Sequence, residues 1–209
     1  YEVNTNPKEV EEIINILKHE IHPNQNGTYP SVGIATFNIN QRNLITEAIN
    51  IVSGQDLSFW KKLYALKEKG LFIKNLENIQ GDERDIIIIS TTYGIKTDGK
   101  FSQNFARLNR IEWYKLLNVL ITRAKKKVFV CTSIPKEKYL SYADSLKTEG
   151  NNKRGILYAY LTYAEAISNH DYQVAEFILK TLKEQSYEKP RAISQNDGLS
   201  ESPFEEEVY

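Results

Sequence analysis

The sequence lacks several features that would point directly to a function, such as multiple cysteines, clustered histidines or a strong net charge. Its 209 residues include no methionine, one cysteine and three histidines, and the formal net charge is zero. The single cysteine, Cys131, excludes an internal disulfide and favours a reducing compartment, here taken as the cytoplasm. The three histidines are scattered without the spacing of metal ligands, so that no metal site is predicted.

Two further absences narrow the class of protein. Zero net charge excludes a global basic field that would attract nucleic acid, so any such binding needs a local patch. No apolar run approaches the roughly 18 residues of a membrane span, and no basic and apolar leader opens the chain. Because the sequence has no methionine even at its start, we expect it to be a piece of a longer protein.

Apolar runs alternate with helical patterns along most of the chain. This alternation predicts an α/β fold, in which a parallel sheet carries helices on both faces and a helical extension follows at the C-terminal end. The expected strands are residues 31–37, 71–79, 85–93 and 128–133. The expected helices are residues 7–21, 41–52, part of 54–70, 112–125, 153–168 and 171–184. Asn6, Pro7 and Glu9 predict a capping box at the start of the first helix.

Two stretches resemble parts of the phosphate-binding site of nucleoside triphosphatases. GIKTDGKF, residues 94–101, nearly spells a phosphate-binding loop, but Phe101 stands where a hydroxyl would ligate Mg²⁺. DIIIIS has its carboxylate, Asp85, at the start of the strand, whereas the metal-binding acid of such proteins stands at the end. Neither half of a phosphate site is therefore predicted within this chain.

One charged residue stands where the helical pattern calls for an apolar one. Arg123 follows Leu116, Val119 and Leu120 by seven, four and three residues, which places it on the apolar face of the expected helix. An arginine with its stem on the core and its head in water would explain this position. A basic cluster surrounds it in sequence, and it could bind phosphates or be a solvated surface: Arg107, Arg110, Lys115, Lys125, Lys126 and Lys127.

Three segments, in this order, resemble the second motor domain of superfamily 1 helicases, which has a RecA-like fold. GIATFNINQ, residues 33–41, resembles the strand that ends in Thr-Pro-Tyr-x-x-Gln. QGDERDIIIIS, residues 80–90, matches the motif Gln-Gly-x-Glu-x-Asp before an apolar strand. LLNVLITRAK, residues 116–125, is similar to the motif that carries the family's arginine, although Lys115 and Leu116 replace two common arginines.

The resemblance implies roles for particular residues. Arg123 would be an arginine finger, and Gln80, Gly81 and Glu83 would line the nucleotide cleft, with Glu83 near the ribose. ATP and Mg²⁺ would be held mainly by an upstream RecA-like domain. Thr36, Gln41, Thr92 and Lys115 would lie along single-stranded or partly duplex nucleic acid, expected to be DNA, although each of the first three, taken alone, reads first as a cap or turn residue. Since ligands of parallel sheets bind at the carboxyl ends of strands, we expect these residues to gather there.

The same resemblance extends to the organisation of the whole protein. Residues 1–135 would form the RecA-like domain, 136–185 a helical extension, and 186–209 a linker with the start of a further domain. SPFEEEVY, residues 202–209, resembles the first helix of the very-short-patch-repair-like endonuclease that follows the motor in some large bacterial helicase-like proteins. The full-length protein would then hydrolyse ATP, and this piece alone would not. The alternatives are a degenerate module that binds nucleic acid or a partner without hydrolysis, and a motor that targets a nuclease.

Overall fold

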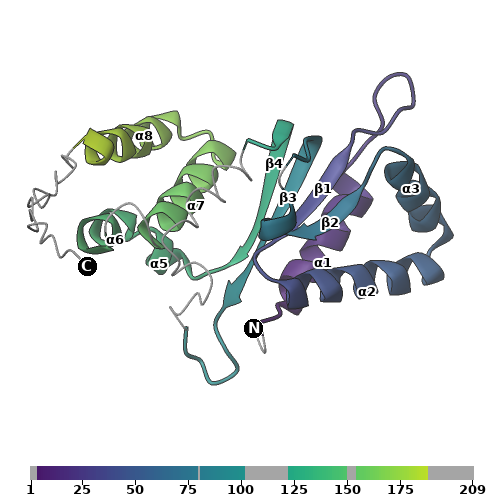
Figure 1. Ribbon diagram of the computed structural model, residues 1–209, viewed down its shortest axis with the longest axis horizontal. Coiled ribbons are helices and arrows are strands. Elements are labelled where there is room, and N and C mark those ends of the chain that lie inside the picture. The colour runs from purple at the N-terminus through teal and green to yellow at the C-terminus, as the bar shows by residue number, and fades with distance from the viewer. Residues whose placement is uncertain (1–3, 80, 102–121, 150–153, 188–209) are drawn as a thin grey trace, which may run out of the picture.

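A four-stranded, all-parallel sheet organises the computed structural model, which describes residues 4–79, 81–101, 122–149 and 154–187 (Figure 1). The strand order is β2-β1-β3-β4. The strands are β1 Val32–Thr36, β2 Phe72–Asn75, β3 Arg84–Gly94 and β4 Ala124–Ser133. The α/β prediction with a parallel sheet is confirmed.

Helices flank the sheet at both ends of the chain. The N-terminal part contributes α1 Pro7–Asn15, the π-helical turn η1 Ile16–Glu20, α2 Ile39–Gln55, α3 Leu57–Glu68 and the 3₁₀ turn η2 Leu76–Asn78. The C-terminal part contributes α5 Lys136–Tyr139, α6 Tyr142–Glu149, α7 Arg154–Ser168 and α8 Tyr172–Tyr187. Figure 1 shows this C-terminal group beside β4, away from α2 and α3.

Each face of the sheet belongs to its own hydrophobic cluster, because successive side chains of a strand point to opposite faces. Ile34 and Ile88 pack with the apolar side of α1, α2 and α3. Ile87 and Ile89 join the cluster that also holds Leu157 and other residues of the C-terminal helices. The central strand β3 is therefore buried on both faces, which its nearly continuous apolar sequence predicts.

The expected helix over residues 112–125 is wrong at its end. Thr122 and Arg123 form a turn, and β4 already begins at Ala124. Pairing with β3 explains the difference, because Ala124 lies opposite Arg84 and Lys127 lies opposite Ile86. Residues 102–121 lie outside the described part of the chain.

The expected cap of the first helix is half right. The Asn6 side chain accepts the N–H of Glu9 at 3.4 Å, as an N-cap should. The reciprocal half of a capping box is wrong, because the Asn6 N–H donates instead to Oε1 of Gln41 at 2.7 Å. The carboxylate of Glu9 is thereby left for other partners.

A glycine in β1 lets an aromatic ring lie against the sheet. A Cβ added at Gly33 would stand 2.3 Å from Cζ of Phe72, whose side chain is buried. We expect Gly33→Ala to lower the free energy of unfolding by about 1–3 kcal/mol, because the ring must leave its position. Urea unfolding measures this value. Gly54→Ala in α2 is the matched control, since an added Cβ meets nothing within 4 Å there and helix propensity favours alanine by up to about 1 kcal/mol. Equal unfolding midpoints for the two variants would contradict the expectation.

Candidate functional site

Two of the residues that were predicted to bind a nucleotide, Glu83 and Arg123, lie close together at the starts of β3 and β4. The N–H of Arg84 donates to the carbonyl oxygen of Arg123 at 3.0 Å, and Arg84 pairs with Ala124 in the sheet. Glu83 and Arg123 immediately precede these paired positions. We call the region around Gly81, Glu83 and Arg123 the amino edge of the sheet.

Side chains at the amino edge are accessible to a ligand. Glu83 and Lys125 form an ion pair at 3.5 Å, with 52% and 58% of their side chains exposed. Such exposed pairs contribute little to stability, so the carboxylate can exchange its partner at small cost. Gly81 is exposed, has a φ of 88°, and has open space where a Cβ would stand. Backbone can therefore approach a ligand closely at this position.

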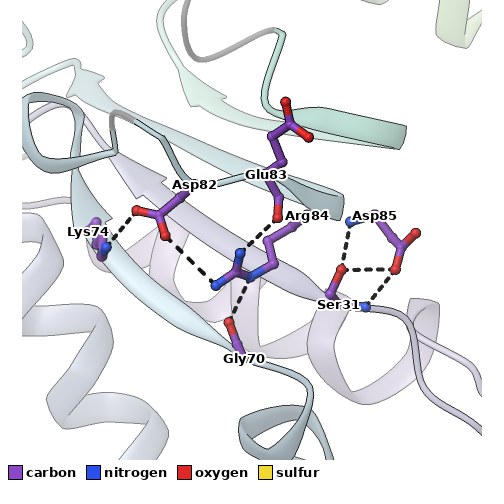
Figure 2. A network of polar contacts seen from close by, with 7 residues as sticks. All are labelled: Ser31, Gly70, Lys74, Asp82, Glu83, Arg84 and Asp85. Carbon is purple, nitrogen blue, oxygen red and sulfur yellow. Dashed lines mark hydrogen bonds and ion pairs between the residues drawn. The ribbon is translucent and has the colours of Figure 1, made fainter.

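A polar network fixes the backbone on which Glu83 stands (Figure 2). Asp82 accepts from Nζ of Lys74 at 2.6 Å and lies 3.9 Å from the Arg84 guanidinium. Arg84 in turn donates to the carbonyl oxygens of Gly70 at 2.8 Å and of Glu83 at 2.7 Å. The loop is thus held by residues that precede and form β2, while the Glu83 carboxylate points away from the network in Figure 2.

The last acid of the motif, Asp85, has a structural role here. Its carboxylate accepts from both the N–H and the hydroxyl of Ser31 at 2.9 Å, and from Nζ of Lys126 at 2.8 Å. The Lys126 ammonium, followed by the Ser31 N–H, lowers the pKa of Asp85 to about 2. An ionised Asp85 therefore ties the start of β3 to the residue before β1 and to β4.

Three of the residues predicted to contact nucleic acid lie within the described part of the chain. They are found at the carboxyl ends of the strands, opposite the amino edge. The side chains of Thr36, Gln41 and Thr92 are all 0% exposed. The Thr36 hydroxyl donates to the carbonyl oxygen of Asn38 at 2.8 Å, and Nε2 of Gln41 donates to the hydroxyl of Ser90 at 3.1 Å. In this arrangement none of the three side chains reaches solvent, so their contact with a phosphate stays a prediction and would require neighbouring residues to move.

A buried acid, Glu9, which the sequence predicts only as part of a helix cap, lies at the centre of this region. Glu9 is 3% exposed. Its Oε2 accepts from the hydroxyl of Ser90 at 2.6 Å and the N–H of Thr92 at 2.8 Å, and its Oε1 accepts from the N–H of Ser133 at 3.0 Å. Burial raises the pKa of Glu9 to about 7, although these hydrogen bonds each lower it.

The sequence did carry a signal for Glu9. It precedes Ile13, Ile16 and Leu17 by four, seven and eight residues, which is the spacing of one helix face. All three of these side chains are buried in one cluster. The helical spacing that marks Arg123 as unusual therefore also places Glu9 on the apolar face of its helix.

Thr92 has a strained backbone at this end of β3. Its φ is 72°, a conformation that β-branched residues rarely adopt. It lies where the pairing of β3 with β4 becomes irregular, between Ser90 and Gly94. The Thr92 N–H donates to Glu9, its carbonyl oxygen accepts from Nδ2 of Asn6 at 3.0 Å, and its buried hydroxyl oxygen has no hydrogen-bond partner among the described residues. We call the region of Glu9, Gln41, Ser90, Thr92 and Ser133 the carboxyl edge.

The two edges are separated by the length of β3. Eight residues run from Arg84 to Thr92, which at a strand rise of about 3.3 Å is roughly 26 Å. The expectation that all predicted site residues gather at the carboxyl ends of strands is therefore wrong for Glu83 and Arg123, because each precedes its strand. Gln80 and Lys115 lie outside the described residues.

The described residues hold neither a metal-binding cluster nor a membrane-spanning helix. In that part of the chain, no three His, Cys, Asp or Glu side chains gather as they would around a metal ion. No described helix combines the length and apolar character that crossing a membrane requires.

Comparison with known proteins adds a family and two relatives. Residues 2–134 match the family model described as an AAA domain. A protein of Mycoplasma pneumoniae named "Uncharacterized ATP-dependent helicase MG140 homolog" is 36% identical over 151 residues, which is 70% of this chain and 12% of the relative. The protein named "Uncharacterized ATP-dependent helicase MG140" of Mycoplasma genitalium is 34% identical over 151 residues, with the same coverage of 70% and 12%. The chain thus spans only about an eighth of the length of these relatives.

Proposed function

We propose a function from the premise that this chain belongs to the AAA domain family, which it matches over residues 2–134. In this proposal it is the second RecA-like motor domain of an ATP-dependent superfamily 1 helicase or translocase that acts on DNA. The names of the two relatives, both ATP-dependent helicases, support this assignment. ATP hydrolysis would belong to the longer protein, because its other domains would complete the site.

The observation that carries the proposal is the meeting of Glu83 and Arg123 at the amino edge. The two residues come from motifs about 40 positions apart in sequence. The backbone of Arg123 is nevertheless hydrogen-bonded to Arg84, the residue after Glu83. An arginine and an exposed carboxylate at neighbouring positions suit a nucleotide, since a guanidinium can face phosphate and a carboxylate can accept from ribose hydroxyls.

The residues present fit part of a nucleotide site and not all of it. Arg123 would stabilise charge on the γ-phosphate, Glu83 would accept from the ribose, and Gly81 and Gln80 would line the cleft. A bound ATP with Mg²⁺ supplies the phosphoryl group that is transferred. Phosphoryl transfer depends on positioning and charge stabilisation more than on covalent chemistry of the protein. The phosphate-binding lysine and the metal-binding acids would come from an upstream RecA-like domain.

The carboxyl edge is the proposed track for nucleic acid. Movement along a strand without sequence preference needs contacts to phosphates from hydroxyls, amides and main-chain N–H groups. Thr36, Gln41 and Thr92 would supply such groups at this edge once neighbouring residues move, because all three are buried here, and Lys115 is proposed to add a positive charge. Single-stranded or partly duplex DNA is the expected partner.

An ATPase assay tests the proposed function. The full-length protein is expected to hydrolyse ATP faster when single-stranded DNA is present, whereas the 209-residue chain alone should not hydrolyse ATP above background. Released phosphate measures both rates. Hydrolysis by the isolated chain at the rate of the full-length protein would refute the division of labour between the two domains. Full-length protein that binds DNA without hydrolysing ATP would instead support the degenerate binding module.

The finer family assignment is also a proposal. Membership among the large bacterial helicase-like proteins with a very-short-patch-repair-like endonuclease rests on residues 202–209, which lie outside the described part of the chain. A metal-dependent nuclease activity of the full-length protein would support it. Loss of that activity on removal of the segment after residue 209, with the ATPase retained, would assign the nuclease to that segment.

A further inference from the structure

The carboxylate of Glu9 joins the ends of two strands to helix α1 and the start of α2. We propose that Glu9 is a positioning residue for the carboxyl edge, which holds Thr92 in its strained conformation and so keeps this edge ready to engage single-stranded DNA. This inference rests on the proposed function. Glu9 itself would not touch DNA, because its side chain is buried.

Both oxygens of the Glu9 carboxylate are surrounded by donors. Oε2 receives the Ser90 hydroxyl and the Thr92 N–H. Oε1 receives the Ser133 N–H at 3.0 Å, the Thr91 hydroxyl at 3.2 Å and Nδ2 of Asn6 at 3.3 Å. Only a carboxylate accepts at both positions, and hydrogen bonds to an ionised acceptor are stronger than those to a neutral one. The hydrogen-bonding pattern therefore fits a carboxylate and not an amide, although burial opposes the charge.

The bonds to Glu9 fall where the regular ladder is interrupted. Ser90 pairs with Cys131, and the next pair is Gly94 with Ser133, so that β3 uses four residues where β4 uses two. Thr92 lies within this irregular stretch, and Ser133 closes it on the other strand. Glu9 accepts an N–H from each side and thereby fixes the shape of the bulge. Bulges of this kind aim side chains and are common next to functional sites.

The hydrogen bonds to Thr92 hold its backbone in a strained conformation. A non-glycine residue in the left-handed region costs on the order of 1–3 kcal/mol and persists only when its surroundings enforce it. Here the Thr92 N–H is held by Glu9 and the Thr92 carbonyl oxygen by Asn6. Release of the N–H would remove half of this constraint.

The same carboxylate reaches the predicted nucleic-acid residue on α2. The Ser90 hydroxyl donates to Glu9 and accepts from Nε2 of Gln41. Gln41 is bonded in turn to both backbone groups of Asn6, through Oε1 to the N–H at 2.7 Å and through Nε2 to the carbonyl oxygen at 3.1 Å. Gln41 and Thr92 are thus two ends of one network that has Glu9 at its centre.

Glu9→Gln in the full-length protein tests the proposal. The amide must turn its NH₂ group toward one set of donors, and each set includes the backbone N–H of Thr92 or of Ser133. We expect the concentration of oligothymidine DNA that half-saturates the ATPase to rise about tenfold, while the KM for ATP, which reports on the distant amino edge, stays within about twofold. Glu11→Gln on the exposed side of the same helix is the matched control and should leave both values unchanged.

A double-mutant comparison separates positioning from a general loss of stability. Glycine adopts a positive φ without strain, so in a Thr92→Gly background, which already lacks the proposed hydroxyl contact, Glu9→Gln should change the half-saturating DNA concentration by less than about twofold. A rise of about tenfold in that background as well would show that Glu9 does not act through the backbone of Thr92. A Glu9→Gln protein with the DNA dependence of Glu11→Gln would overturn the proposal as a whole.

Two further outcomes remain interpretable. If Glu9→Gln does not fold, Ser90→Ala removes a single donor to the carboxylate, and we expect about a threefold rise in the half-saturating DNA concentration. A folded Ser90→Ala protein with the wild-type value would overturn the inference. A wild-type protein whose ATPase does not respond to DNA would refute the proposed function instead, before any variant is compared.

Discussion

Replacing Arg123 with alanine in the full-length protein is expected to lower ATP turnover by at least about 10³-fold, which is the lower range for removal of an arginine finger. The guanidinium would stabilise charge that develops on the γ-phosphate during transfer, and water cannot replace a fixed, permanently charged fork. Binding of ATP should change little, because the upstream domain would hold most of the nucleotide. Steady-state turnover and equilibrium binding of a non-hydrolysable ATP analogue measure the two effects separately.

Two companion variants sharpen this experiment. Arg123→Lys keeps the positive charge but loses the planar fork, so only a small part of the turnover should return. Arg154→Ala, at the start of α7 in the C-terminal helices, removes an arginine far along the chain from either motif and should leave turnover at the wild-type level. Turnover of Arg123→Ala within about tenfold of wild type would rule out the finger assignment.

The second large effect is a dependence of stability on pH that Glu9 introduces. Its pKa is about 7 in the folded protein and 4.5 in the unfolded reference, so the folded chain binds an additional proton between these values. The resulting stabilisation is complete below pH 4.5 and is lost as pH rises through about 7. A difference of this size corresponds to about 3 kcal/mol in the free energy of unfolding.

Comparison of Glu9→Gln with the wild-type chain isolates this contribution from other titrating groups. Between pH 4.5 and pH 7.5, the difference in unfolding free energy should move by about 3 kcal/mol in favour of the variant, because glutamine has no charge to desolvate. Nearby Cys131 should not interfere, since burial and the negative charges of Glu9 and Glu12 raise the pKa of its thiol. Urea unfolding at several pH values measures the shift. Curves for variant and wild type that run parallel would show that Glu9 does not titrate in this range.

Glu9→Gln would separate what Glu9 does for stability from what it does for function. Above pH 7 the glutamine variant is expected to gain relative stability while it loses its response to DNA. A residue kept only for packing would show the opposite relation, in which loss of function follows loss of stability. The role of the buried acid would then be its placement of Thr92 and Ser133.

Local sequence patterns were enough to predict the sheet. The run from Ile86 to Ile89 has no polar break, and only a strand covered on both faces can bury it. The structure places this run in β3, between β1 and β4. The helix pattern after Asn6 was equally readable, because the cap, Pro7 and the apolar spacing agree with one another.

The junction at Arg123 shows where such patterns fail. Residues 116–131 contain a helical repeat that runs directly into a strand repeat, and periodicity alone cannot locate the boundary between them. Pairing of Ala124 with Arg84 decides it, and that contact joins residues 40 positions apart. The motif nevertheless predicted that Glu83 and Arg123 belong to one site.

The arrangement of the carboxyl edge could not be predicted from the sequence, because it also depends on contacts between distant residues. The bond from Ser133 to Glu9 spans 124 residues, and that from Thr92 to Glu9 spans 83. No local spacing encodes such partners, so Thr36, Gln41 and Thr92 could be proposed as nucleic-acid contacts but could not be predicted to be buried. Burial of Gln41 and Thr92 accompanies the convergence of α1, α2 and two strand ends on one carboxylate.

The pairing of β3 on both sides has a mechanical consequence. From Ile86 to Ser90 the strand is hydrogen-bonded to β1 and β4 at once, and its side chains are packed on both faces. A segment held in this way is rigid, because it cannot lengthen or slide against its neighbours without breaking several hydrogen bonds at once. A displacement at Ile86 would therefore reach Ser90 with little loss, whereas Thr92 lies outside this rigid segment, in the irregular pairing beyond Ser90.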